Sequence, residues 1–162
     1  MRQVEELRYL VLAIQREGNR LYAADLRPLG VTPSQAEVLR VLSDHQPLTL
    51  VGLGELLVCE TSTSPSRLVD RLVTQGLVRR DLDPGDRRFV TLSLTRESAD
   101  LMRAIVEAEE RLYSTLEQLT AGLPLGEGLR LLRGMAGGFP AGQALERRRG
   151  GVDHGQRPGL TT

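Results

Sequence analysis

The feature that most constrains this chain of 162 residues is a change of pattern within residues 59–94. In the first half of that stretch, apolar residues recur at the steps that mark the buried face of a helix. These residues are Leu68, Val69, Leu72 and Val73. Ser64 is a favourable N-cap, Pro65 suits the first helical position, and Gly76 is a favourable terminator. The pattern therefore predicts a short helix that begins near Ser64 and ends near Gly76.

Beyond Gly76 the spacing becomes that of two short strands, at residues 77–80 and 89–94. In the second strand, apolar and hydroxyl residues alternate, which indicates a half-buried strand. Residues 83–85, Asp-Pro-Gly, have the chemistry of a turn, and Arg87 and Arg88 follow it. A helix followed by a hairpin with a basic tip is the outline of a winged helix-turn-helix. Such a unit can place its helix in the DNA major groove and its hairpin in a neighbouring groove.

Two further helices are expected before this stretch. Thr32 and Gln35 match a capping box, which predicts a helix that starts after Thr32 and ends near residue 44. Thr49 is a suitable cap for a third helix that runs to about Val58. A short polar connection then leads to the arginine-bearing helix, so the winged helix-turn-helix is expected over residues 32–95.

Long apolar stripes flank this unit on both sides, over residues 3–26 and 96–137. The first stripe is heptad-like, and the second follows Thr95, a suitable N-cap. The main members of the two stripes are Val4, Leu7, Val11, Ile14, Leu21, Met102, Ile105, Leu112, Leu116 and Leu119. Packing within one subunit would explain the first stripe equally well. Because a domain of this size does not need two such seams, we expect them to be buried together across a two-fold axis. The expected fold is mainly α, with a small β-wing and dimerisation helices at both ends.

Positive charge is concentrated in the helix and hairpin, although the net charge of the chain is zero. Residues 61–96 hold seven arginines and four acids, a balance of +3, whereas residues 97–137 hold four arginines and seven acids, a balance of −3. No lysine is present, so every basic side chain is a guanidinium that can bind phosphate or guanine with two hydrogen bonds. This distribution favours a partner with phosphates, namely double-stranded DNA. A solvated surface of mixed charge is the alternative.

Other function classes find little support. The chain has one cysteine, which excludes a disulfide framework or a cysteine-rich zinc site. It lacks a nucleophile–base pair, a phosphate loop and a metal cluster, so we expect no enzyme activity and no cofactor. No signal peptide and no apolar run of membrane-spanning length is found, which predicts a cytoplasmic protein without a membrane partner. Residues 138–162 are rich in Gly, Pro and polar residues and are expected to form a flexible tail.

Three segments together resemble the MarR family of bacterial transcriptional regulators. They are SRLVDRLVTQGLVRR at 66–80, DPGDRR at 83–88 and LSLT at 92–95, in the order and spacing of that family. The resemblance covers residues of about 29–121 and implies a MarR-like domain over 1–137. It also implies a homodimer with two winged helices, which binds a roughly palindromic operator, usually as a repressor.

The resemblance also assigns DNA contacts. In the recognition helix they are Ser66, Arg67 and Arg71. In the wing they are Asp86, Arg87 and Arg88, where the acid typically braces the wing arginine. The turn before the recognition helix is one residue longer than usual in the family. Which of Thr63, Ser64 and Ser66 reaches the bases is therefore left open.

The resemblance implies a small-molecule effector as well, because phenolic or lipophilic molecules often bind between the dimerisation helices and the winged helix in this family. Arg20, Tyr22 and His45 are the candidates here. A metal-ligand role for His45 is disfavoured against a capping or solvent-facing role, because the only other histidine is His154. A redox switch through Cys59 is an alternative function. No basic residue adjoins Cys59 to lower its pKa, so a small buried apolar side chain is the competing interpretation.

Overall fold

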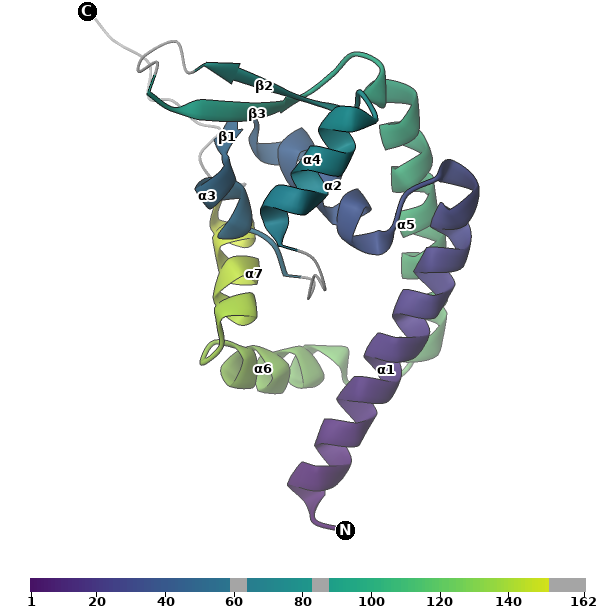
Figure 1. The fold of residues 1–162 in the computed structure, drawn as a ribbon. Helices are drawn as coiled ribbons and strands as arrows, with labels where there is room; N and C mark the ends of the chain where they lie inside the picture. The colour runs from purple at the N-terminus through teal and green to yellow at the C-terminus, as the bar shows by residue number, and fades with distance from the viewer. Residues whose placement is uncertain (59–63, 83–87, 152–162) are drawn as a thin grey trace, which may run out of the picture.

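The computed structural model describes residues 1–58, 64–82 and 88–151. Within these ranges, seven α-helices and one short 3-10 helix surround a three-stranded sheet (Figure 1). The elements are α1 (Gln3–Leu26), η1 (Arg27–Leu29), α2 (Pro33–His45), β1 (Leu48–Thr49), α3 (Leu50–Gly54), α4 (Pro65–Thr74), β2 (Val78–Leu82), β3 (Val90–Leu94), α5 (Ser98–Thr120), α6 (Leu125–Ala136) and α7 (Pro140–Gly151). None of these helices has the length and apolar character that a membrane span requires.

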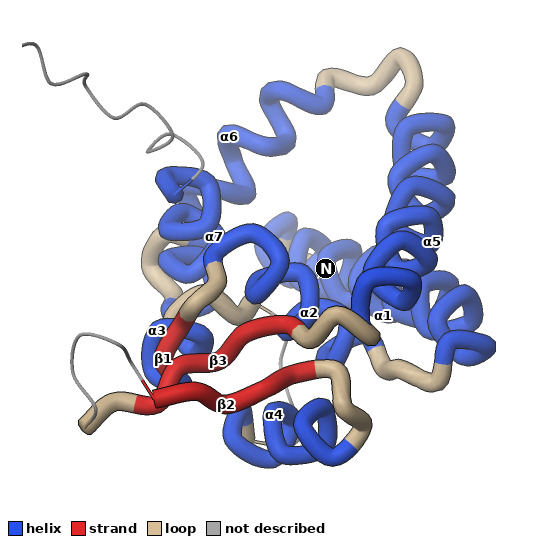
Figure 2. Tube along the Cα trace, turned by 90° about the horizontal axis from the view of Figure 1, so that it is seen from above, coloured by secondary structure: helices blue, strands red, loops and turns tan. Residues whose placement is uncertain are grey.

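The sheet is antiparallel with strand order β1-β3-β2. Val78 pairs with Leu94 at one end of the β2–β3 hairpin, and Leu82 pairs with Val90 at the other. The two strands of the predicted hairpin are thus confirmed. β1 was not expected, because its two residues are too few to show an alternating pattern. Figure 2 shows the sheet beside α4, with α1 and α5 on the other side of α2.

The core lies between the sheet, α2, α4 and the first half of α5. Its fully buried large side chains include Leu26, Leu39, Leu42, Leu53, Leu72, Leu92 and Ile105. The inner face predicted for the arginine-bearing helix is confirmed, since Leu68, Val69 and Leu72 are buried there. The mainly α winged helix-turn-helix that the sequence predicts is therefore the fold of this chain.

Local capping chemistry fixes several helix ends as expected. The Thr32 hydroxyl accepts a hydrogen bond from the backbone N–H of Gln35, whose side chain accepts the N–H of Thr32 in return. The hydroxyl of Thr49 accepts the N–H of Gly52 at 3.1 Å. Gly76 has a φ of +71°, a left-handed conformation that favours glycine after a helix.

Two expected ends and one expected capping bond are wrong, although α4 begins at Pro65 after Ser64 as predicted. α3 ends at Gly54 rather than near Val58, and its two glycines weaken the last turn. The Ser64 side chain makes no capping bond, because its hydroxyl lies 3.0 Å from that of Ser66. Thr95 does not cap α5; its hydroxyl donates to the carbonyl of Gly76 instead, and the helix begins at Ser98.

α1 and α5 lie side by side to the right of Figure 1 and carry the winged helix at one end. Much of the apolar stripe of α1 faces solvent within one chain: Val4 is 67% exposed and Ile14 66%. The leucines of α6 are exposed as well, including Leu129 and Leu132. Packing within one subunit therefore leaves a large part of both stripes exposed.

The flexible tail expected from residue 138 onward is wrong for residues 140–151, which form helix α7. The helix runs back toward α3 after a tight turn (Figure 1). Gly142 enables that turn, since a Cβ there would overlap the carbonyl of Ala136. The sequence of α7 is polar on average and has almost no apolar periodicity, so it does not predict a helix. Residues 152–162 lie outside the described ranges.

Candidate nucleic-acid interface

Helix α4 presents two arginines to solvent on a scaffold that is buried behind them. Arg67 and Arg71 lie one turn apart and are both exposed. Among the residues that the structure describes, neither guanidinium has a hydrogen bond or an ion-pair partner. Packing of the inner face in the core fixes the position of α4. Both guanidinium groups on the outer face remain available for an anion or a base edge.

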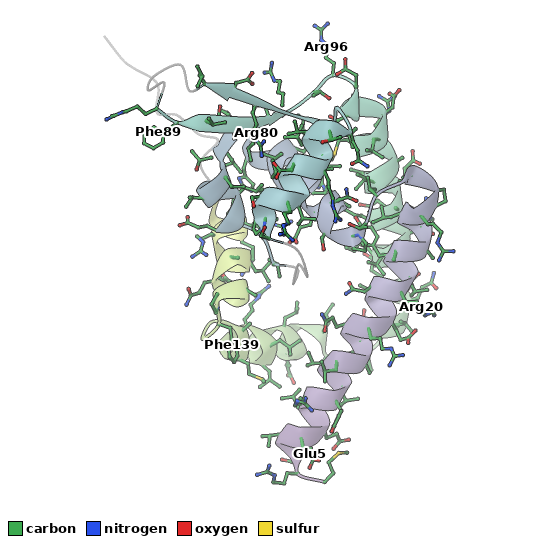
Figure 3. All side chains as sticks on the ribbon, viewed as in Figure 1. Glu5, Arg20, Arg80, Phe89, Arg96 and Phe139 are labelled. Atoms are coloured by element: carbon green, nitrogen blue, oxygen red, sulfur yellow. The ribbon has the colours of Figure 1, made fainter. Side chains whose placement is uncertain are left out.

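The carboxylate on the same helix is neutralised by the sheet. Asp70 accepts a hydrogen bond from Arg80 of β2, with 2.5 Å between the carboxylate oxygen and the guanidinium nitrogen. Figure 3 shows Arg80 where β2 passes close to α4. This pair fixes α4 against the hairpin and offsets the one negative charge between Arg67 and Arg71. The exposed face of α4 is therefore net positive, as phosphate binding requires.

The N-terminal end of α4 carries the two described hydroxyl candidates. Ser64 is exposed and Ser66 half-buried, and their hydroxyl oxygens are 3.0 Å apart. Either hydroxyl can exchange this bond for a contact with a phosphate or a base. Thr63 lies outside the described residues. The assignment of Ser64 and Ser66 to DNA contacts stays a prediction.

Of the three wing candidates, the structure describes only Arg88, which is exposed and has an interaction partner. Asp86 and Arg87 lie outside the described residues. The far end of the hairpin also exposes Leu82, Phe89 and Val90, as Figure 3 illustrates for Phe89. The alternation over residues 89–94 predicts Val90 on the buried face of the strand, and this is wrong, because Val90 is 45% exposed. A small apolar surface thus lies next to Arg88. The only sequence feature that points to it is Phe89, an aromatic residue between Arg88 and the first residue of β3.

A second cluster of charged groups joins the winged helix to the long helices. Glu109 of α5 lies 3.0 Å from Arg40 of α2 and accepts a hydrogen bond from Tyr22 of α1 at 3.3 Å. Its side chain is only 14% exposed. Burial raises the pKa of Glu109 above its ordinary value, while Arg40 and Tyr22 act in the opposite direction. Burial and the nearby carboxylate likewise raise the pKa of Tyr22. One carboxylate therefore connects three helices from distant parts of the chain.

Replacing Glu109 with glutamine is expected to change how stability depends on pH. Because the pKa of Glu109 is raised on folding from 4.5, the folded state holds the proton more tightly than the unfolded state does. The stability gained in this way is fully present below about pH 4.5 and is lost as the pH rises through the raised pKa. Urea denaturation should show the unfolding free energy of Glu109→Gln increasing relative to the original protein across that window. Parallel pH profiles would contradict this expectation.

The three effector candidates occupy different environments. Tyr22 belongs to the Glu109 cluster, whereas the Arg20 side chain is 67% exposed and pairs with Glu17 at 2.7 Å. Figure 3 shows Arg20 on the outer side of α1. His45 is half-buried at the end of α2. Within the described part of the chain, no hydrogen bond or ion pair joins the three, so their role in binding an effector stays a prediction.

The described residues contain no group of three or more His, Cys, Asp or Glu side chains that could hold a metal ion. Cys59 lies outside these residues, so the structure does not test its surroundings. The sites that can be described are therefore the exposed basic face of α4 and the Glu109 cluster. The first is suited to binding an anionic polymer, and the second to joining the winged helix to the long helices.

Comparison with known proteins places these features in a family. A family model described as "MarR family" matches residues 29–88, from η1 to the wing. The organic hydroperoxide resistance transcriptional regulator of Bacillus subtilis is 32% identical over 107 residues, which cover 66% of this chain and 72% of that protein. The multiple antibiotic resistance protein MarR of Escherichia coli is 32% identical over 90 residues, which cover 56% of this chain and 62% of that protein.

Solved structures show the same architecture. A cysteine-to-serine mutant of E. coli MarR in complex with operator DNA matches with a TM-score of 0.72 and 25% identity, over 82% of this chain and 95% of that one. The S. aureus MepR–DNA complex matches in fold with a TM-score of 0.72 at 23% identity, over 81% of this chain and 96% of that one. Because sequence relatives, family model and fold agree, the chain belongs to the MarR family of winged helix transcriptional regulators.

Proposed function

We propose that this protein is a homodimeric regulator that binds a pseudo-palindromic operator in double-stranded DNA and acts as a repressor. The observation that carries the proposal is the pair of exposed arginines on α4, Arg67 and Arg71, which have no hydrogen-bond or ion-pair partner among the described residues. Two guanidinium groups one turn apart can contact neighbouring base pairs or phosphates in the major groove. The similarity to a MarR protein in complex with operator DNA supports this use of the helix.

The wing would add a second contact. Arg88 lies at the start of the returning limb of the hairpin, where a winged helix approaches the neighbouring groove. A narrow minor groove has an enhanced negative potential that attracts an arginine. In this proposal Arg88 enters that groove, Asp86 braces it and Arg87 binds phosphate. The nearby apolar side chains Leu82 and Phe89 would cover sugar carbons.

A homodimer is supported by the apolar surface that one chain leaves exposed. α1 and the last turns of α5, together with α6, present aliphatic stripes to solvent. Such surfaces are characteristic of protein interfaces, and a two-fold axis would bury both stripes at once. The same axis would place two α4 helices in successive major grooves, which explains why the operator should be nearly palindromic.

We also propose that the protein responds to a small-molecule effector. The Glu109 cluster supports it, because a ligand near Tyr22 would alter the connection between the long helices and α2. The redox alternative through Cys59 stays a prediction, and the alkylation rate of this thiol would test it.

Capture of genomic DNA by the purified protein tests the proposed function. Sheared DNA from the source organism is bound, washed at moderate salt and sequenced, with an Arg67→Ala/Arg71→Ala variant as the matched control. The proposal expects a few sites to be enriched, sharing a motif with two inverted halves, and no enrichment by the variant. Uniform recovery of the genome by the original protein would contradict specific operator binding.

A further inference from the structure

Helix α7 lies against the helix-turn-helix at a distance from the exposed face of α4. Figure 1 shows α7 below α3, rising toward it from the turn after α6. Ala144, in the middle of α7, is only 2% exposed. Phe139 and Pro140 line a cleft together with Val51 and Gly54 of α3. The helix is thus docked on the first helix of the helix-turn-helix pair, although its sequence shows almost no apolar periodicity.

Two arginines of α7 make polar contacts with this unit. Arg148 donates to the carboxylate of Glu37 in α2 at 2.8 Å, and the Glu37 side chain is only 8% exposed. Arg147 donates through Nε to the backbone carbonyl of Glu55, the residue that follows α3, at 3.0 Å. Charge-assisted hydrogen bonds to a largely buried carboxylate are among the stronger polar contacts in proteins.

Glu37 connects Arg148 to the backbone that leads to the recognition helix. The same oxygen that faces Arg148, Oε1, also accepts the backbone N–H of Val58 at 2.8 Å. Val58 is the last described residue before the connection to α4, and α3 itself packs against α4. A guanidinium in the C-terminal helix, a carboxylate in α2 and the backbone between α3 and α4 are therefore joined at a single atom.

We propose that Arg148 and Glu37 are positioning residues for DNA recognition. Resting on the proposed function, this inference assigns α7 the task of bracing α3 and the backbone at Val58 so that α4 is presented to DNA in one orientation. Without Arg148, the largely buried Glu37 carboxylate would lose a charged hydrogen-bond donor and turn toward water. It would then release the Val58 N–H and leave the end of α3 less restrained. Base contacts depend on such geometry more strongly than phosphate contacts do, so specific binding should suffer more than non-specific binding.

The test compares three full-length variants. Arg148→Gln removes the charged donor, Arg148→Lys retains a cation, and Arg149→Gln is the matched control, because Arg149 pairs with Glu146 of its own helix. We expect Arg148→Gln to weaken binding to operator DNA about tenfold with little change for scrambled DNA. Arg148→Lys should recover most of this loss, and Arg149→Gln should bind as the original protein does. Circular dichroism checks that every variant is folded.

Hydrogen exchange in the absence of DNA gives an independent readout. The amide of Val58 should exchange faster in Arg148→Gln than in the original protein, whereas amides in the middle of α5 should be unaffected. The inference is overturned if Arg148→Gln keeps the wild-type preference for operator, binds it more tightly, or leaves Val58 exchange unchanged. If the original protein shows no preference for operator over scrambled DNA, the proposed function itself fails. The two failures are thus distinguished by the wild-type titration.

Discussion

Replacing both Arg67 and Arg71 with alanine is expected to remove the preference of the protein for its operator. Both side chains are exposed and unpartnered within the described residues, so their removal leaves the core and the ion pairs of α4 intact. An arginine that makes two hydrogen bonds to guanine contributes about 1–3 kcal/mol of discrimination. The single variants should therefore lose roughly 5-fold to 150-fold in preference, and the double variant should approach non-specific affinity.

Fluorescence anisotropy with operator and scrambled duplexes measures this preference directly. Arg103→Ala is a suitable control, because Arg103 is an exposed arginine on α5 that pairs with Asp100 outside the proposed interface. The control should retain the wild-type ratio of affinities. If both single variants also retain that ratio, α4 does not read the sequence through these arginines.

Introducing glutamate at Leu112 and Leu116 together is expected to separate the subunits. These residues belong to the apolar stripe of α5, and Leu116 is 38% exposed in the isolated chain. Full burial of a leucine side chain contributes roughly 1.5–3 kcal/mol, and a charge at an apolar interface adds a desolvation cost. Because a dimer engages two half-sites and a monomer only one, operator affinity should fall with dimerisation.

Sedimentation equilibrium measures the separation, and a titration with operator measures the linked loss of affinity. Gln118→Glu is the matched control, since it adds the same charge about 200° around the helix from Leu116. That variant should remain dimeric. A wild-type protein that sediments as a monomer at micromolar concentration would contradict the proposed interface.

The sequence predicts the elements whose ends are marked by local chemistry. The capping box at Thr32 and the glycine at position 76 act within a few residues, so the pattern alone locates α2 and the end of α4. The bounds of α1 and the inner face of α4 follow from periodicity. The hairpin follows from alternation on either side of a turn.

Features that depend on tertiary contacts were missed. α7 is polar around most of its surface, and it is docked by Ala144 and by the ion pair of Arg148 with a residue 111 positions earlier. The hydroxyl of Thr95 bonds to Gly76 across the hairpin and is therefore not available as a cap. In the candidate site, the outward direction of Arg67 and Arg71 follows from helical spacing. The convergence of Tyr22, Arg40 and Glu109 does not, because it needs three helices from separate parts of the chain.

Titration of the full-length protein against its captured operator and a scrambled duplex, each at two salt concentrations, tests sequence-specific DNA binding most directly. Specific regulators bind their sites at least about a thousandfold more tightly than random DNA. We expect a preference of that order for the operator at both salt concentrations, and affinities for both duplexes that fall as salt rises, because arginines displace counterions from phosphates. Equal affinity for the two duplexes, or no binding to either, would contradict the assignment of α4 and the wing to operator recognition.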